Sequence, residues 1–163
     1  MNILVTGCAG FIGYHVACKF CSLDHRVFGL DSMNDYYDVN LKFARLAQLN
    51  KNENFHFVKN ELLDYKWLTH FIESNNIKII VHLAAQAGVR HSIKEPMTYV
   101  KNNLEAFTNI LEAARHTRIS NFLYASTSSV YGLNSAQPFS EKQSTNHPIQ
   151  FYAATKKANE LMA

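Results

Sequence analysis

The sequence predicts an α/β protein in which a parallel sheet is covered by helices on both faces. Five short apolar runs recur along the 163-residue chain, and helical patterns lie between them. Each glycine-rich or polar segment of chemical interest follows directly after one of the apolar runs. Because parallel strands end at the same edge of a sheet, these segments are expected to gather in one crevice there.

The elements follow one another in regular alternation. Apolar runs typical of buried strands are Ile3–Val5, Val27–Leu30, Phe55–Val58, Ile77–His82 and Asn121–Ala125. Helical patterns separate them, at about Phe11–Ser22, Asn40–Asn50, Asp64–Ser74 and Met97–Arg115. Residues 137–148 hold two prolines and several polar residues, which predicts a loop before a final helix. With right-handed crossovers, this order predicts a Rossmann-like, doubly wound sheet.

Three glycines follow the first strand, at Gly7, Gly10 and Gly13. They are expected, in order, to permit a tight turn, close backbone approach to a phosphate and close packing of the next helix. The free N–H groups at that helix start would hold a pyrophosphate. The second strand ends at Asp31, whose carboxylate would accept a hydrogen bond from an adenosine ribose and favours NAD over NADP. The alternative is a structural turn with an aspartate that caps a helix.

Tyr152 and Lys156 are four residues apart in the predicted final helix, so their side chains share one face. The ammonium favours the phenolate form of the tyrosine, which could then remove a proton from an alcohol. Four hydroxyl residues, 126–129, follow the fifth strand, and one of them would complete this unit beside a nicotinamide. The alternative for the tyrosine and lysine is an ordinary surface pair, and the alternative for the four hydroxyl residues is a set of turn and cap residues.

Composition narrows the functional classes. Hydrophobic content of 47%, charged content of 18% and a net charge of +3 fit a globular protein, and scattered Lys and Arg do not demand a nucleic-acid partner. No apolar stretch is long enough to span a membrane and no leader precedes the first strand, so we expect a cytoplasmic protein. Cys8, Cys18 and Cys21 are expected to be reduced core thiols, because no second pair completes a metal site.

Together these motifs resemble the extended short-chain dehydrogenase/reductase superfamily, within it the NAD-dependent epimerase/dehydratase family. The resemblance covers the chain and is carried by residues 6–13, 82–90, 128–132 and 152–163. Residues 31–38 and 86–90 are similar to the UDP-glucuronate 4-epimerases in particular.

The resemblance implies a bound NAD that transiently oxidises C4 of a UDP-sugar. It assigns catalysis to Thr127, Tyr152 and Lys156, and substrate contacts to Gln86, Arg90 and Thr127. Tyr152 and Lys156 would also contact the cofactor, together with Gly7, Gly10, Phe11, Ile12, Gly13, Asp31, Asn34, Glu61, Leu62, Leu83, Ala84, Ala85 and Asn103.

Two local sequence differences and the length of the chain qualify this expectation. Asn60-Glu61 stands where relatives carry Gly-Asp, which would weaken adenine binding, and Ser128 and Ser129 stand where 4,6-dehydratases carry acids, which favours an epimerase. Relatives continue into a C-terminal substrate domain, so residues 1–163 are expected to form an incomplete NAD-binding domain, truncated after the catalytic helix. The alternative is a truncated or split remnant that binds NAD without independent catalysis. A homodimer or a separately encoded C-terminal half would then be a partner.

Overall fold

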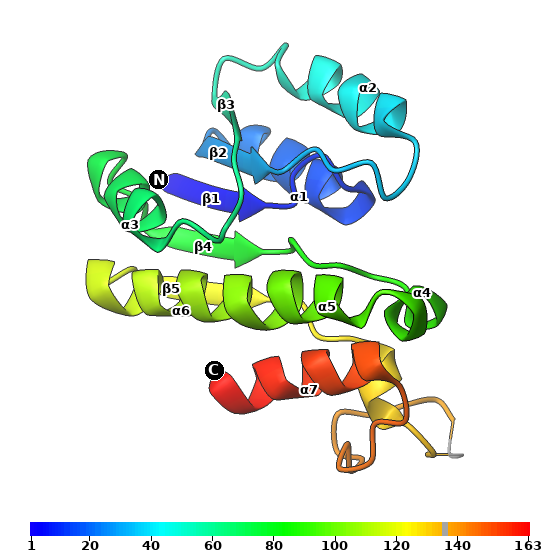
Figure 1. Ribbon diagram of the computed structural model, residues 1–163. Coiled ribbons are helices and arrows are strands. Elements are labelled where there is room, and N and C mark those ends of the chain that lie inside the picture. Colours follow the sequence, from blue (N-terminus) through cyan, green and yellow to red (C-terminus); the bar gives the residue numbers. More distant parts are fainter. Residues whose placement is uncertain (135–136) are drawn as a thin grey trace.

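A computed structural model, which describes residues 1–134 and 137–163, contains a five-stranded parallel sheet with the order β3-β2-β1-β4-β5 (Figure 1). The strands are β1 (Asn2–Thr6), β2 (Arg26–Asp31), β3 (Phe55–Lys59), β4 (Ile79–His82) and β5 (Asn121–Tyr124). The strand order reverses direction at β1, because β2 and β3 lie on one side of it and β4 and β5 on the other. The predicted doubly wound sheet is therefore confirmed, and its crevice lies between the ends of β1 and β4.

Helices cover both faces of the sheet. Helices α1 (Phe11–Cys21) and α2 (Val39–Leu49) pack on one face, against a core that includes Ile3 and Val5. Helices α3 (Tyr65–Ser74) and α6 (Ala106–Thr117) pack on the other, against a core that includes Leu4. This alternation of neighbouring β1 residues between two cores is the two-residue period of a strand buried on both sides.

The helix predicted at Met97–Arg115 is present but irregular. It begins as α5 (Pro96–Tyr99), continues through a π-helical segment η1 (Val100–Glu105), and becomes α6. The predicted helical pattern did not specify the π-helical form of η1, in which the polar Asn103 is only 1% exposed. Such π-helical turns are frequent at functional sites.

Smaller differences also have local causes. The fourth strand begins at Ile79 rather than Ile77, because the Ile77 N–H is bonded to the Ile72 carbonyl and closes the end of α3. A short helix α4 (Val89–Lys94), which the sequence did not predict, follows β4.

The C-terminal helix α7 (Phe151–Met162) lies alongside α6 (Figure 1). The short 3-10 helix η2 (Ser128–Tyr131) leads into the predicted loop, and α7 packs against η1, α4 and η2. Among the described residues β5 pairs only with β4, and Leu123 on the α1 side of the sheet is 52% exposed. Over residues 1–134 and 137–163, no helix has the length and apolarity to traverse a bilayer.

Candidate functional site

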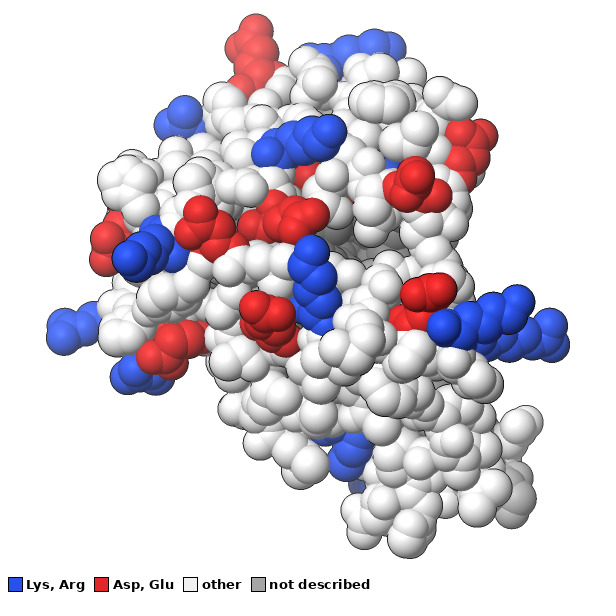
Figure 2. Space-filling model, viewed as in Figure 1, with Lys and Arg blue, Asp and Glu red and all other residues white. Residues whose placement is uncertain are grey.

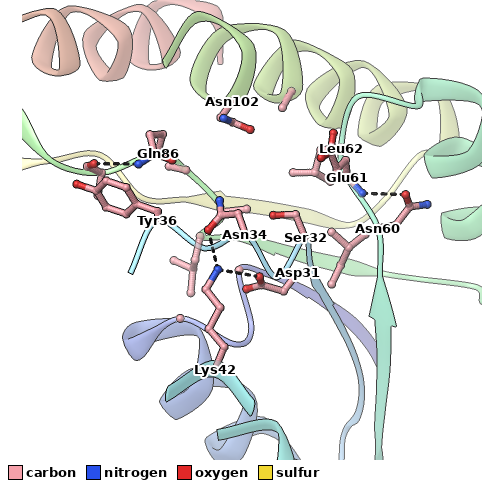
Figure 3. Close-up of a pocket in the computed structure, with 18 of the residues that line it drawn as sticks. Asp31, Ser32, Asn34, Tyr36, Lys42, Asn60, Glu61, Leu62, Gln86 and Asn102 are labelled. Atoms are coloured by element: carbon pink, nitrogen blue, oxygen red, sulfur yellow. Dashed lines mark hydrogen bonds and ion pairs between the residues drawn. The ribbon is translucent and has the colours of Figure 1, made fainter. Parts of the chain in front are cut away.

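A cavity of ≈ 280 Å³ opens at the carboxyl ends of β1, β2 and β4 (Figure 3). The loops after these strands and after β3 line it, as the sequence predicts for a crevice at this edge. The predicted cofactor residues that line the cavity are Gly7, Gly10, Asp31, Asn34, Glu61, Leu62, Leu83, Ala84 and Ala85, and Gln86 joins them. In Figure 2 acidic and basic side chains are interspersed over the visible face, which is hollowed near its centre.

The glycine turn forms the wall of this cavity nearest α1. Gly7 has a φ of +71°, and a Cβ there would lie 2.9 Å from the backbone N of Ala84. A Cβ on Gly13 would overlap the carbonyl oxygen of Gly7, so both glycines are required by the close approach of the backbone. No side chain caps the start of α1, which leaves its first-turn N–H groups free for an anion. Phe11 and Ile12 are exposed and would contribute only these N–H groups.

Asp31 lies beside the glycine turn and accepts from three donors. Its Oδ2 accepts from the Ala9 N–H at 3.1 Å, and its Oδ1 accepts from the Met33 N–H at 2.9 Å. Lys42 Nζ lies 3.5 Å from Oδ1 and donates to Asn34 Oδ1 at 2.8 Å (Figure 3). The Asp31 and Lys42 side chains are only 7% and 6% exposed. Asp31 therefore braces the glycine turn and neutralises a buried cation, and it caps no helix.

Lys42 is a site residue that the sequence reasoning missed. Its signal is its spacing, because Lys42, Leu46 and Leu49 form the buried stripe of α2. A lysine within an apolar stripe needs a buried anion, and Asp31 supplies it.

The loop after β3 is held by α6. Asn109 Nδ2 donates to the carbonyl oxygens of Leu62 and Leu63, both at 3.0 Å. Leu62 is buried, whereas Glu61 is exposed and pairs with Lys101 at 3.7 Å. Asn109 thus fixes the edge of the cavity predicted for adenine, and no sequence motif marked it.

Asn103 supports the cavity from behind instead of lining it. Its Oδ1 accepts from the Gln86 N–H at 2.7 Å, and its Nδ2 donates to the Gln86 carbonyl at 3.0 Å and to Thr155 Oγ1 at 3.1 Å. The π-helical segment therefore connects the loop after β4 to α7.

Arg90 lies apart from the cavity, in a groove of ≈ 430 Å³ along α4 with His91 and Lys94. Tyr36 lines both the groove and the cavity, and its ring centroid lies 5.0 Å from that of His91. The structure thus separates the two predicted substrate residues, Gln86 and Arg90, on either side of Tyr36.

Tyr152 and Lys156 lie in the first half of α7, outside the cavity lining. The Tyr152 N–H donates to Ser92 Oγ of α4 at 3.1 Å, and its ring is 6.1 Å from that of Tyr99. The Tyr99 hydroxyl in turn lies within hydrogen-bond distance of the carbonyls of Ala87 and Gly88. Through Tyr99, Tyr152 therefore adjoins the end of the loop after β4. Lys156 is 3% exposed, and burial lowers its pKa to about 8.

Thr127 follows β5 and caps η2, because its Oγ1 accepts from the Ser129 N–H at 3.2 Å. This is the capping role that was the alternative to catalysis, and it leaves the hydroxyl hydrogen free to donate. The neighbouring Ser126 donates to Glu160 of α7, which ties the end of β5 to that helix.

The cysteines are free thiols: Cys8 and Cys21 are buried and Cys18 is half-buried, so the expectation of core packing holds for two of them. In the part of the chain that the structure describes, no cluster of three His, Cys, Asp or Glu side chains is placed to hold a metal ion.

Known proteins match this chain in sequence over nearly all of its length. The family model described as GDP-mannose 4,6 dehydratase matches residues 4–163. Protein CapI of Staphylococcus aureus is 52% identical over 163 residues, which are 100% of this chain and 48% of that protein. A probable UDP-glucuronate 4-epimerase of Rhizobium meliloti is 45% identical over all of this chain and 48% of its own length.

Among solved structures, a UDP-glucuronic acid 4-epimerase from Bacillus cereus, in complex with UDP-glucuronic acid and NAD, superimposes with a TM-score of 0.89. Its sequence is 35% identical, and the match covers 99% of this chain and 51% of that one. The chain therefore spans about half the length of the relatives it matches.

Proposed function

Since the chain belongs to the family described as GDP-mannose 4,6 dehydratase, we propose that residues 1–163 form the NAD-binding domain of a nucleotide-sugar 4-epimerase of the UDP-glucuronate/UDP-galacturonate type. One observation carries this proposal. The glycine turn, Asp31 and the loop after β4 open onto one cavity, and that loop is tied to the helix that holds Tyr152 and Lys156. Relatives named UDP-glucuronate 4-epimerase support the choice of reaction.

Each part of a dinucleotide would have its own set of residues in the cavity. The uncapped start of α1, with Gly10, Phe11 and Ile12, would bind the pyrophosphate. Asp31 and Asn34 would hold the adenosine ribose, and Glu61 and Leu62 the adenine. The segment from Leu83 to Ala85 would face the middle of the cofactor, while Asn103 keeps that segment in place.

The chain's own groups would then handle the proton. Tyr152 would remove the proton of the sugar 4-hydroxyl. Lys156 would favour the phenolate form of Tyr152 and bind the nicotinamide ribose. Thr127 would donate a hydrogen bond from its hydroxyl to the sugar oxygen. At this site NAD would supply a hydride acceptor for C4 and its reduced form a hydride donor, so that C4 could be re-formed with the opposite configuration. Gln86 and Arg90 would contact the substrate from either side of Tyr36. Ser128 and Ser129 supply no acid–base pair for dehydration, which favours epimerisation over 4,6-dehydration.

Thermal unfolding of the 163-residue chain with and without NAD tests cofactor binding. A ligand at about 100 times its Kd stabilises the folded state by ~2.7 kcal/mol, so we expect millimolar NAD to raise Tm by roughly 8 °C. NADP should have a much smaller effect, because Asp31 would repel its 2′-phosphate. No shift with NAD at millimolar concentration would reject the proposal.

Turnover of UDP-glucuronate to UDP-galacturonate tests catalysis separately. We expect Tyr152→Phe to abolish turnover while it leaves the NAD-induced shift in place, and Tyr65→Phe on α3 to change neither. NAD binding without turnover by the wild-type chain would support the second candidate, an NAD-binding chain without independent catalysis. Turnover that appears only with a complementary C-terminal half, or only in a dimer, would identify that partner.

A further inference from the structure

Side chains as well as sheet hydrogen bonds join the carboxyl ends of β1 and β4. Thr6 and His82 are partners in the register of these strands, and they are 0% and 2% exposed. Thr6 Oγ1 lies 2.8 Å from His82 Nδ1. The proposed function assigns neither residue a role, although both lie directly before cavity loops.

The same hydroxyl oxygen also binds the loop after β4. It accepts from the Leu83 N–H at 3.2 Å and from the Ala84 N–H at 3.1 Å. The Leu83 N–H is shared with the Thr6 carbonyl oxygen, also at 3.2 Å. A hydroxyl has one hydrogen and two lone pairs. With both lone pairs facing N–H donors, its hydrogen points to His82 Nδ1, which must then carry no proton.

The surroundings of His82 agree with a neutral ring. Its centroid lies 5.5 Å from that of Phe107 and 6.2 Å from that of Phe122. Burial, and then the charge of Lys156, lower the pKa of His82 to about 3. The neutral ring has one proton to place, and the Thr6 hydroxyl assigns it to Nε2.

The backbone of Gly7 lies close to the Leu83–Ala84 peptide, since a Cβ on Gly7 would meet Ala84 N at 2.9 Å. We propose that Thr6 and His82 are positioning residues that fix the loop segment 83–85 against the glycine turn through a neutral, Nε2-protonated His82. The effect on NAD rests on the proposed function, whereas the hydrogen bonds and the tautomer do not.

The tautomer can be measured in the wild-type chain by ¹⁵N NMR of the His82 ring between pH 8 and pH 5. We expect signals of a neutral ring protonated on Nε2 throughout this range. A ring protonated on Nδ1, or a charged ring at pH 6, would overturn the proposal. This measurement needs neither a substitution nor the cofactor.

Two substitutions at one position test the function of the hydroxyl. Thr6→Val removes the hydroxyl with little change of shape, and Thr6→Ser retains it. We expect amide exchange of Ala84 to become at least tenfold faster in Thr6→Val, since one lost hydrogen bond of ~1.4 kcal/mol is worth about a factor of ten, and exchange of Leu83 to become faster by less, because its N–H keeps the Thr6 carbonyl. The Kd for NAD should rise by a similar factor. Thr6→Ser should behave as wild type.

Thr117→Val is the matched control, because it removes a hydroxyl that donates to the Ala113 carbonyl at 2.8 Å, remote from the cavity. Wild-type exchange of Leu83 and Ala84 in a folded Thr6→Val chain would overturn the proposal. If Thr6→Val does not fold, the tautomer measurement decides. If wild type binds no NAD, the proposed function fails. The exchange rates and the tautomer still show whether Thr6 and His82 position the segment 83–85.

Discussion

Lys156 shows at the scale of one residue how the role proposed for it conflicts with stability. Its side chain is buried against the ring of Phe107, with Nζ 6.0 Å from the ring centroid. Burial lowers its pKa from the usual 10.5 to about 8, and Glu160 only partly opposes this. The folded chain therefore binds fewer protons than the unfolded chain between these two values, and stability rises with pH through that window.

We expect Lys156→Met to be more stable than wild type at pH 7, by about 2 kcal/mol, because the cost of burying the charge is then fully present. The gain should shrink as pH rises from 8 towards 10.5, where the lysine is neutral in both states. Urea unfolding at pH 7 and pH 9.5 measures the difference. Lys157→Met, which instead loses contacts to Glu160 and Thr145, should show no such gain. A Lys156→Met chain that is no more stable than wild type at pH 7 would contradict the expectation.

Single residues also mark the limit of what the sequence predicts about the site. The glycine turn and Asp31 were predictable because the order of strand, three glycines, helix, strand and acid forms a motif that can be read from the chain. Lys42 and Asn109 were not, since no motif marks either residue, although each holds part of the cavity wall through its side chain. Asn103 was correctly placed near the cavity, but its amide holds the Gln86 backbone rather than lining the cavity.

At the scale of elements, buried strands were the easiest to predict, because both faces of β1, β2 and β4 require apolar residues. The helix 96–117 was predicted in extent but not in geometry. The apolar spacing of an α-helix and of one with a π-helical segment is too similar to reveal the wider turn at η1. Helix α4 was missed because its six residues are too few for a periodic pattern.

Helix α7 depends on α4 for its start. Gln150 precedes α7 and provides no side-chain cap, whereas Ser92 Oγ of α4 accepts from the Tyr152 N–H and donates to the Val89 carbonyl at 2.7 Å. The buried Ser92 therefore acts as a cap supplied from another helix, and it fixes the backbone of the tyrosine.

We expect Ser92→Ala to lower the free energy of unfolding by about 1 kcal/mol, as the loss of a helix cap does. Amide exchange should accelerate at Tyr152 and Ala153, and the unfolding energy follows from urea titration. Ser74→Ala removes an exposed serine hydroxyl that donates to Phe71 and serves as the control. Unchanged exchange at Tyr152 in Ser92→Ala would show that the cap contributes nothing.

At the scale of the whole molecule, the sheet is protected unequally. On its β3 side Phe55 is buried in the core with α1 and α2, but Leu123 of β5 remains exposed on the same face. An exposed apolar side chain on a strand with one pairing partner favours association between chains.

We expect Leu123→Lys to reduce concentration-dependent association of the 163-residue chain, measured by light scattering after gel filtration, while the NAD-induced shift persists. Leu23→Lys is the control, because Leu23 is 50% exposed but lies on a turn after α1. Equal effects of the two substitutions would show that added charge, and not the sheet edge, governs association.

Tyr36 forms part of the wall of both the cavity and the Arg90 groove, so a rotation of its ring would change the shape of both. A ligand that turned this ring from one side would then alter the affinity on the other side. Thermodynamic linkage makes that influence reciprocal: whatever free energy the first ligand contributes to binding of the second, the second returns in equal measure. A single aromatic ring on a loop thereby gives the two compartments a means of cooperative occupancy.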